Sequence, residues 1–288
     1  MIIFISEGRL GNQIFQSMFL QRISKVDERI VVFGFDELAR VFDCRRFTTF
    51  SKNKKSNRIF LKIIKSIIYS LQKLNLITFI YPEKHYFKQY SMEMDKYKVK
   101  EGFIGTLKLV GQGTFHSENF FSKNDVDNLH IHERLSRESR DLISKYPQSK
   151  KNIFVHIRLG DYKNYTVFGK NPILDISYYK KCMRTYFVNE NTNFIIFSDE
   201  IKLVKEELRE FDNVFFSENN AFELDFVIMT MCDGAILSPS SFGWWGAYLM
   251  ALKSDIYAPK HWLGFHSGID YPCNPMPNFF KRIKINNV

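Results

Sequence analysis

Four residues near the middle of the chain, His156, Arg158, Gly160 and Asp161, have types and spacing that suit chemistry on a phosphate. They end an apolar run, 153–157, that predicts a buried strand. In open α/β sheets the ligands are contacted at the carboxyl ends of the strands. An arginine there keeps its charge, and its fork of N–H donors matches phosphate oxygens. One arginine after a strand is usually structural, so the interpretation depends on the segments that accompany it.

Polar clusters follow three further expected strands, at residues 8–12, 198–200 and 238–241. The serines of the last cluster precede an apolar helical segment, where serine is a typical N-cap. The same position offers backbone N–H groups and the positive end of a helix to a phosphate. Both interpretations of the serines stay open on that segment alone. Taken together, the four clusters are typical of a nucleotide-sugar transferase.

The composition is that of a globular protein with one large or two ordinary domains: 288 residues, 45% hydrophobic and 16% aromatic. The formal net charge of +10 fits a phosphorylated ligand, a nucleic acid or an anionic membrane, but no nucleic-acid-binding signature is found. Four scattered cysteines without metal-ligand spacing predict reduced thiols. Neither a signal peptide nor a membrane-spanning run is found, so we expect a cytoplasmic protein.

The second half of the chain alternates strands and helices from about residue 153 to 258, which predicts a parallel sheet wrapped by helices. The first half begins with a strand, a glycine turn and a helix, a phosphate-binding layout. It lacks the GxGxxG pattern of dinucleotide-binding oxidoreductases. A charged helix is expected over 124–145, and the polar stretch 146–152 is the best linker. We therefore expect domains at 1–149 and 150–288.

Residues 58–80 carry apolar side chains at helical spacing, punctuated by Lys62, Lys65 and Lys73. The lysines argue against a transmembrane span. Two interpretations remain open. The helix either packs on its domain or presents a basic amphipathic face to a membrane surface.

Four segments in this order carry a resemblance to a known family. They read Gly8-Arg-Leu-Gly-Asn-Gln-Ile-Phe15, His156-Ile-Arg-Leu-Gly-Asp-Tyr162, Phe197-Ser-Asp199 and Ser240-Ser-Phe-Gly-Trp-Trp-Gly-Ala247. They resemble the motifs of the α-1,2-fucosyltransferases, glycosyltransferase family 11, from residue 8 to about 250. The resemblance implies a GT-B fold, in which two Rossmann-like domains face each other across a cleft. It also implies GDP-fucose as donor, a galactoside acceptor, inversion at the anomeric carbon, and no required metal or other cofactor.

The resemblance also assigns roles to single residues. Arg158 is similar to the arginine that binds the donor diphosphate, and His156 to a histidine that lines the GDP site. Asp225 stands where related enzymes place a guanine-binding carboxylate. The remaining donor-binding residues implied are Ser240, Ser241 and Phe242 in the diphosphate turn, and Gly11 and Asn12 in the N-terminal loop. Two positions depart from the family pattern: Leu159 replaces a frequent second arginine, and Gly243 a frequent serine.

A sugar nucleotide that loses its sugar develops negative charge on the β-phosphate, and a preorganised group must stabilise it. Arg158 with the serine turn is a solution without a metal ion. The Asp-x-Asp string at 125–127 predicts a solvated helix start rather than a metal site. We therefore expect no metal ligands in this chain.

The acceptor hydroxyl needs a base. Asp161 and Glu7 are the candidates, with His156 more remote. Asp161 is equally well interpreted as the structural partner of Arg158. Tyr162 and Tyr165, which follow the arginine strand, either line the acceptor groove or are surface aromatics.

We expect the N-terminal half to hold the acceptor and the C-terminal half to bind GDP-fucose. The expected reaction moves L-fucose to O2 of a terminal β-galactoside in a bacterial surface glycan such as O-antigen. A glycan carried on a membrane lipid would give residues 58–80 a reason to touch the inner face of the plasma membrane. The alternatives are transfer of another GDP-linked 6-deoxyhexose or hexose, and a nucleotide-binding protein without turnover. No nucleic-acid partner is expected.

Overall fold

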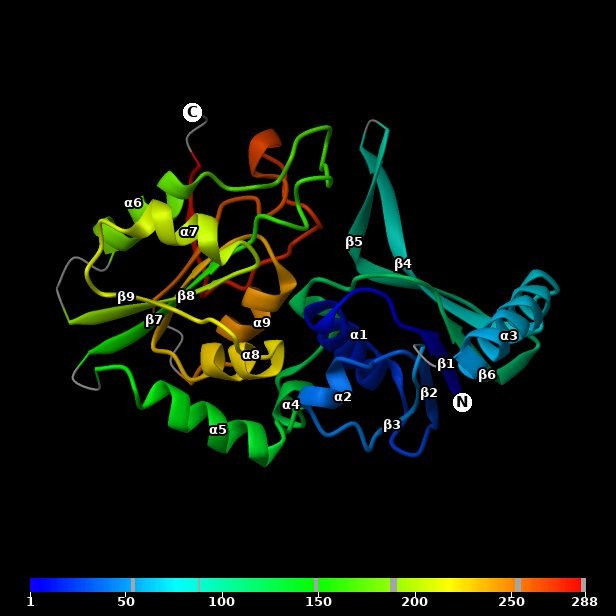
Figure 1. Ribbon diagram of the computed structural model, residues 1–288. Coiled ribbons are helices and arrows are strands. Elements are labelled where there is room, and N and C mark those ends of the chain that lie inside the picture. The colour runs from blue at the N-terminus through cyan, green and yellow to red at the C-terminus, as the bar shows by residue number, and fades with distance from the viewer. Residues whose placement is uncertain (53–54, 88, 148–149, 187–190, 252–254, 286–288) are drawn as a thin grey trace. The chain divides into compact units, whose positions relative to one another are not determined.

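The computed structural model describes residues 1–288 except 53–54, 88, 148–149, 187–190, 252–254 and 286–288. Contacts between residues divide the chain into two units, Met1–Ile131 and His132–Val288. Within the described residues, each unit is built on its own six-stranded sheet (Figure 1). The expected α/β class is therefore confirmed.

The sheet of the first unit has the strand order β3-β2-β1-β6-β4-β5. Its strands are β1 (Ile2–Ile5), β2 (Ile30–Phe33), β3 (Phe47–Phe50), β4 (Ile77–Phe87), β5 (Tyr90–Lys100) and β6 (Ile104–Val110). Neighbouring strands are parallel except β4 and β5, which form an antiparallel hairpin. The apolar N-terminal run forms β1 at the middle of this sheet, where Ile2 and Phe4 are buried.

The helices of the first unit are α1 (Leu10–Ile23), α2 (Leu38–Val41), α3 (Lys55–Lys73) and α4 (Lys123–Asp127), with a 3-10 turn at Glu118–Phe120. The prediction of one helix over 58–80 is wrong at its C-terminal end. Asn75 adopts a left-handed conformation, with φ of 52°, and stops α3. The β-branched residues Ile77 and Thr78 then enter β4, where strand pairing outweighs the continuing helical period.

The sheet of the second unit has the order β12-β11-β10-β7-β8-β9, and every neighbouring pair is parallel. Its strands are β7 (Lys151–Ile157), β8 (Thr192–Ser198), β9 (Val214–Phe216), β10 (Gly234–Leu237), β11 (Ile256–Pro259) and β12 (Lys281–Ile283). From β7 the chain builds outward through β8 and β9, and then returns to build β10 to β12 on the other side. The direction of the strand order thus reverses between β7 and β10, which is where open α/β sheets bind ligands.

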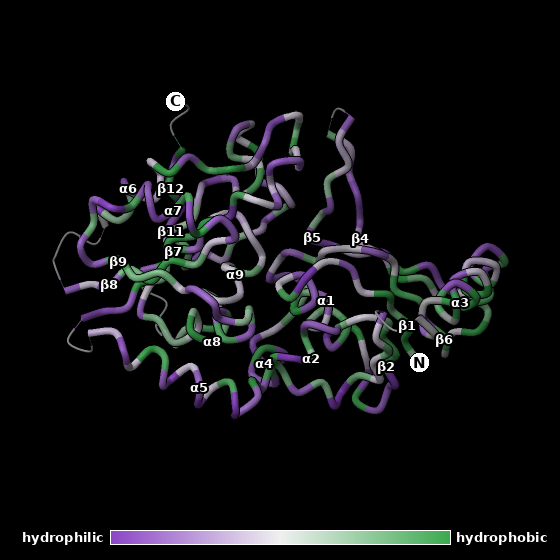
Figure 2. Tube along the Cα trace, in the orientation of Figure 1, coloured by the Kyte–Doolittle hydropathy of each residue, from purple (hydrophilic) through white to green (hydrophobic). Residues whose placement is uncertain are grey.

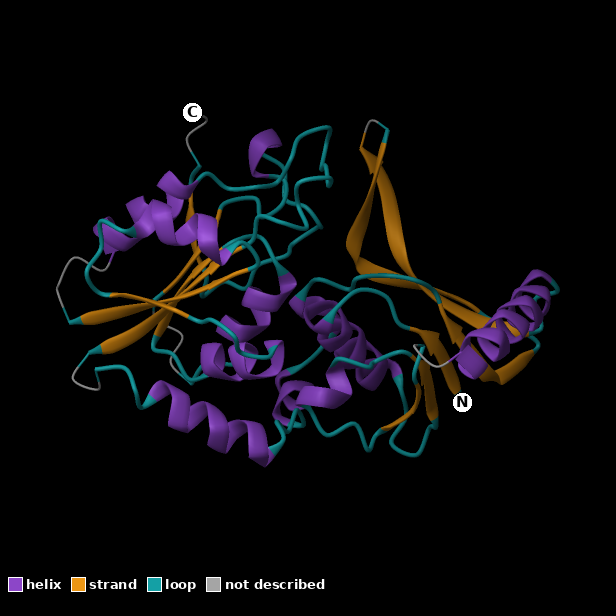
Figure 3. Cartoon of the chain, viewed as in Figure 1, coloured by secondary structure: helices purple, strands orange, loops and turns teal. Residues whose placement is uncertain are grey.

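The helices of the second unit are α5 (Glu133–Ile143), α6 (Ile176–Tyr186), α7 (Ile201–Leu208), α8 (Phe222–Thr230) and α9 (Ser241–Tyr248), with a 3-10 turn at Phe265–Ser267. Helices α6 and α7 cover one face of the sheet, and α5, α8 and α9 lie on the other (Figure 3). On the first of these faces, the hydrophobic core joins the apolar residues of β7 and β8 to α6 and α7. Hydrophobic positions concentrate along these central strands (Figure 2). Burial on both faces holds their carboxyl ends in place.

The charged helix expected over 124–145 is two helices, α4 and α5. The break occurs because Ile131 forms a β-bridge with Phe42, and the amide of Asp43 donates to the carbonyl of His130. Helix α5 packs on α8, so it belongs to the second unit. The contacts therefore divide the chain between residues 131 and 132. The domain boundary expected at 149 falls on residues 148–149, outside the described part.

Candidate active site

Three of the four predicted polar clusters meet at one edge of the second sheet. The strand register places His156 of β7 beside Leu237 of β10 on one side and Phe197 of β8 on the other. Because the three strands are parallel, the residues that follow them gather at their common carboxyl edge. These residues are Arg158, Ser238 and Asp199. The fourth cluster, at 8–12, belongs to the first unit.

Arg158 lies between two carboxylates. Its Nη2 pairs with Asp161, and its Nε lies 3.3 Å from Oδ2 of Asp199. The arginine side chain is 20% exposed, so its charge is partly shielded from water and still reachable. Asp161 is 61% exposed, so the ion pair on that side is weak. Of the two predicted roles of Asp161, the structure shows the pairing with Arg158.

Asp199 holds the loop that carries Arg158. Its Oδ1 accepts the amide of Leu159 at 2.9 Å, and its Oδ2 accepts the amide of Asp161 at 3.3 Å. Burial acts to raise the pKa of Asp199, but these amides, that of Gly160 and the charge of Arg158 outweigh it and hold the pKa below its usual value. Asp199 belongs to the motif Phe197-Ser-Asp199, but the sequence alone assigns no role to its side chain. It is a positioning residue for the arginine loop.

His156 is buried and neutral. Its Nδ1 lies 2.8 Å from Oγ of Ser238, which ties β7 to the serine turn. Burial, assisted by the charge of Arg158 and opposed by Asp199, lowers the pKa of His156 to about 3. A group with that pKa is a weak base, so the remote candidacy of His156 as the catalytic base is not supported. A Cβ on Gly243 would lie 2.9 Å from the His156 ring, so glycine permits the close approach of α9.

The turn from Ser238 to Ser241 leads directly into α9. Ser240 is the N-cap residue, but its side chain makes no capping hydrogen bond. The hydroxyl of Tyr162 donates to the carbonyl of Pro239 at 2.6 Å and fixes the turn against the arginine loop. The turn therefore places hydroxyl groups and the amides of the first turn of α9 on the same edge as Arg158. Such an arrangement of cation, hydroxyls and amides can bind phosphate oxygens.

The two tyrosines predicted for the acceptor side differ in burial. Burial raises the pKa of the Tyr162 phenol well above its usual value, and its hydroxyl is engaged with the turn. Tyr165 is 39% exposed, and its ring centroid lies 5.8 Å from that of Tyr162. Burial, aided by Tyr271, raises the pKa of Tyr165 to about 12. Of the pair, Tyr165 is the one that presents surface to a ligand.

Asp225 lies in the first turn of α8, and an aromatic chain connects that helix to the site. The ring of Phe226 is 5.5 Å from Phe242, whose ring is 5.8 Å from His156. The hydroxyl of Ser217 donates to Oδ1 of Asp225 at 2.6 Å. Burial raises the pKa of Asp225 to about 6, although hydrogen bonds from Ser217 and Asn220 act against it. A half-buried carboxylate of this kind is suited to accept N–H donors from a ligand.

The N-terminal loop of the first unit is held by polar contacts. Glu7 is exposed, and its carboxylate accepts a hydrogen bond from the side-chain amide of Gln112. Gly8 has φ of 79°, and a Cβ there would lie 2.3 Å from Nδ2 of Asn12. Gly11 is buried in the first turn of α1. The loop thus fixes the amide of Asn12 over a position that only glycine can occupy.

His116 is a residue of this loop's surroundings that the sequence did not single out. Its Nε2 lies 3.0 Å from Oδ1 of Asn12, and its ring centroid lies 4.6 Å from that of Phe15. Burial lowers the pKa of His116 to about 3, so the ring is neutral. A neutral ring donating from Nε2 would fix which way the Asn12 amide points. No motif in the sequence links two residues so far apart in the chain.

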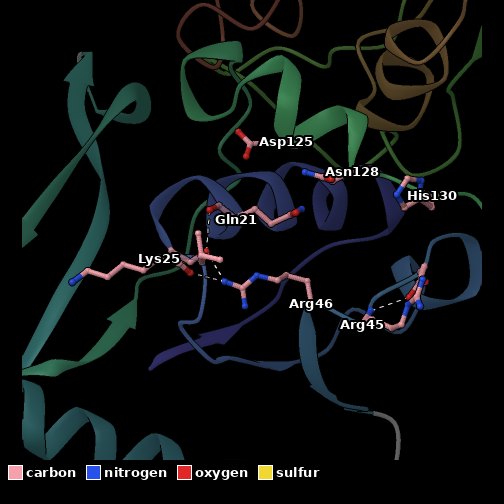
Figure 4. Close-up of a pocket in the computed structure, with 10 residues that line it drawn as sticks. Gln21, Lys25, Arg45, Arg46, Asp125, Asn128 and His130 are labelled. Atoms are coloured by element: carbon pink, nitrogen blue, oxygen red, sulfur yellow. Dashed lines mark hydrogen bonds and ion pairs between the residues drawn. The ribbon is translucent and has the colours of Figure 1, made fainter.

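A cavity of about 460 Å³ lies in the first unit, between the end of α1, α4 and the loop before β3. Figure 4 shows Arg46 reaching across to Lys25. Nη1 and Nη2 of Arg46 donate to the carbonyls of Glu28 and Lys25, both at 2.8 Å, so the guanidinium already has hydrogen-bond partners within the protein. Arg45 is paired with Asp43 at 2.5 Å. None of the predicted site residues lines this cavity.

Asp125 confirms the predicted helix start. Its carboxylate accepts the amide and the hydroxyl of Ser122, both at 2.7 Å, in a capping box at the beginning of α4. In the part of the chain that the structure describes, no group of three or more His, Cys, Asp and Glu side chains is placed to hold a metal ion.

Comparisons with known proteins identify the family of the chain. A family profile described as glycosyl transferase family 11 matches residues 1–265. An α-1,2-colitosyltransferase from Escherichia coli is 28% identical, over 74% of this chain and 73% of the relative. The O-antigen biosynthesis glycosyltransferase WbnK, also from Escherichia coli, is 26% identical, over 88% of this chain and 92% of the relative.

A solved structure shares the fold. The crystal structure of NodZ α-1,6-fucosyltransferase soaked with GDP-fucose superposes with a TM-score of 0.53 at 10% sequence identity. The match covers 86% of this chain and 92% of that chain. At this identity the likeness concerns the fold alone, and it confirms the expected GT-B class.

Proposed function

Because the chain belongs to glycosyl transferase family 11, we propose that it transfers L-fucose from GDP-fucose to O2 of a terminal β-galactoside. The observation that carries the proposal is the position of Arg158 at the β7–β10 reversal, beside the turn before α9. There a permanent cation and a helix N-terminus would meet the diphosphate of the donor. The four motifs that resemble α-1,2-fucosyltransferases support the sugar and the linkage.

The proposed reaction is a single displacement with inversion at the anomeric carbon. The acceptor O2 forms a bond to C1 of fucose, the C1–O bond to GDP breaks, and its electron pair stays on the β-phosphate. Arg158 and the serine turn would stabilise this charge without a metal ion. A transition-state contact of this kind is worth a factor of roughly 10² to 10³ in rate. Asp161 or Glu7 would take the proton from the acceptor hydroxyl.

Further residues would bind the donor. Asp225 would accept N–H donors of guanine, and its raised pKa means that its carboxylate gains from such a partner. His156 and Phe242 would line the GDP site, where the neutral ring adds no charge. Gly11 and Asn12 would contact the donor from the N-terminal loop, and Tyr165 would face the acceptor.

We propose that the acceptor is a bacterial surface glycan, assembled on a membrane lipid in the cytoplasm. The relative whose name refers to O-antigen biosynthesis supports this class of acceptor, since the two sequences match over most of their length. The enzyme would then meet its acceptor at the inner face of the plasma membrane.

A second donor is favoured by a specific observation. The relative at 28% identity is named an α-1,2-colitosyltransferase. Colitose is a deoxyhexose like fucose but lacks one more hydroxyl group. Arg158 and the serine turn would bind the diphosphate of either donor equally well. The sugar is therefore decided by contacts other than those to phosphate.

The test is a transfer assay with GDP-fucose and GDP-colitose against an array of β-galactosides, read by mass spectrometry with linkage analysis. We expect an α-1,2-fucosylated product and release of GDP. Arg158→Ala should lower turnover by about 10² or more. Arg184→Ala is the matched control, because Arg184 is 59% exposed and pairs with Glu210 on the surface of the same unit. No transfer from either donor, or normal turnover in Arg158→Ala, would refute the proposal.

A further inference from the structure

The first unit carries an exposed apolar strip on α3. We define the strip as Ile59, Ile63, Ile67 and Leu74, of which the first three lie on the helix and the last follows its end. Their side chains are exposed by 58%, 54%, 53% and 68%. Soluble surfaces carry single exposed apolar residues as a rule, whereas a contiguous group marks an interaction site.

The strip is separate from the side of α3 that packs on the sheet. Ile64, Ile68 and Leu71 make that packing, against Ile77 and Leu109. At about 100° per residue, these three lie roughly 80–140° around the helix from Ile63, whereas the strip lies within about 40° of it. The strip is therefore apolar surface beyond what the fold of the unit uses. Figure 2 shows hydrophobic and hydrophilic positions alternating along α3.

A neighbouring loop extends the strip. The amides of Phe103 and Ile104 donate to the carbonyls of Asn75 and Leu76, at 3.0 and 2.7 Å, so this loop lies against the end of α3. The side chain of Phe103 is 90% exposed, and Ile104 is 43% exposed. An aromatic ring beside an exposed leucine enlarges the apolar surface at this end.

Positive charge borders the strip. Lys62 and Lys73 are exposed and lie roughly 80–100° from Ile63, on the side away from the sheet. The segment 44–82 contains nine Lys and Arg and no Asp or Glu, so it accounts for most of the net charge of +10. An apolar strip with a cationic edge is the pattern of a helix that lies in the plane of a membrane interface.

We propose that the strip and Phe103 dock the protein on an anionic phospholipid bilayer, with α3 lying along the surface. In the described residues no helix is long and apolar enough to cross a bilayer, so α3 would rest at the headgroup level. A second copy of the chain is a poorer occupant, because a symmetric contact would bring two cationic edges together. An anionic headgroup layer complements both the apolar strip and its lysines.

Docking would have a use only if the acceptor is carried on a lipid, and that step alone rests on the proposed function. The docking surface belongs entirely to the first unit, and Arg158 belongs to the second. Binding to vesicles can therefore be measured without donor or acceptor, and its failure would leave the transfer assay untouched.

The first test is sedimentation with vesicles of phosphatidylglycerol and phosphatidylethanolamine, against vesicles of phosphatidylcholine. We expect binding to the anionic vesicles, weakened by salt, and little binding to the zwitterionic ones. The double variant Ile63→Ser/Ile67→Ser should bind at least about tenfold more weakly. Lys62→Glu/Lys73→Glu should lose at least about 25-fold, about fivefold for each positive charge removed, because each new glutamate is also repelled by the anionic surface. Leu203→Ser and Lys202→Glu are matched controls, because both residues are exposed on α7 of the second unit.

The second test follows a single ring. Phe103→Trp adds a fluorophore at a 90% exposed site, and its emission should shift to the blue and be quenched by brominated lipid when anionic vesicles are added. Leu203→Trp should show neither change. Absence of vesicle binding at low salt would overturn the proposal, as would equal binding by the strip variants. A dimer that dissociates in Ile63→Ser/Ile67→Ser, without vesicle binding, would assign the strip to a second copy instead.

Discussion

Replacement of Asp199 by asparagine tests whether the arginine loop is held as the structure shows. The carboxylate accepts the amide of Leu159 with Oδ1, and Oδ2 receives both the amide of Asp161 and the guanidinium of Arg158. Asparagine keeps one acceptor. In one orientation its NH₂ group would face the amide of Asp161 and the guanidinium of Arg158, and in the other it would face the amide of Leu159. All of these groups are donors, so at least one hydrogen bond that the charged carboxylate accepts in the wild type is lost.

The size of the effect on stability follows from these contacts. A hydrogen bond to a charged group contributes about 1.5–3 kcal/mol, and Asp199 is only 19% exposed, so we expect a loss of about 2–3 kcal/mol in urea unfolding at pH 7. The pKa of Asp199 in the folded protein is lowered below its unfolded value of about 4. Its contribution to the free energy of unfolding is therefore present above about pH 4 and is lost as the pH falls through the folded pKa. The stability of Asp199→Asn should therefore fall less on acidification than that of the wild type.

Catalysis should suffer as well, because a misplacement of about 1 Å at a reacting group costs on the order of 10² in rate. We expect kcat with GDP-fucose to fall by about that factor in Asp199→Asn, with a smaller change in KM. Glu200→Gln is the control, because Glu200 is the next residue and pairs with Lys163 at the surface. If Asp199→Asn unfolds at the wild-type urea concentration and keeps its kcat, the positioning role is wrong.

Three further predictions concern other parts of the site. The folded pKa of Asp225 is about 6, against 3.8 for an ordinary aspartate, so the free energy of unfolding of the wild type should fall as pH rises from about 4 through 6. In urea unfolding, Asp225→Asn should therefore gain up to about 3 kcal/mol relative to the wild type between about pH 4 and 7. The same variant should have a higher KM for GDP-fucose. Parallel pH curves would contradict this. Gly243→Ala should cost about 1–3 kcal/mol in thermal unfolding, because its Cβ would lie 2.9 Å from the His156 ring, whereas Gly105→Ala, with open space around it, should be nearly neutral. Transfer activity should persist in EDTA, and activity that returns only with a divalent ion would refute the metal-free mechanism.

The sequence predicted the second unit well because its central strands are buried on both faces. The strand expected at 234–237 is β10 with the same bounds, and the run at 153–157 lies within β7. Strands of this kind appear as continuous apolar runs between glycine and polar residues. The polar clusters behind them could be predicted to meet, because parallel strands share a carboxyl edge.

The sequence failed where tertiary contacts outweigh local pattern. The edge strands β3 and β12 have few buried residues and gave no signal. The end of α3 was missed because apolar residues continue at helical spacing into β4. The role of Asp199 could not be predicted, because its partners are backbone amides about 40 positions away in the chain. His116 was missed for the same reason, since its contact with Asn12 spans 104 positions.

The sharing of Arg158 between two carboxylates has a kinetic consequence for the proposed enzyme. A diphosphate that takes Nη2 of the guanidinium would displace Asp161, which is easy because that carboxylate is largely in water and its pairing is worth at most about 1 kcal/mol. Asp199 stays in place, since the backbone holds it. Binding of the sugar nucleotide would therefore release the carboxylate of Asp161, which is paired with Arg158 until then. The order of addition, sugar nucleotide first and galactoside second, would follow from this exchange of partners.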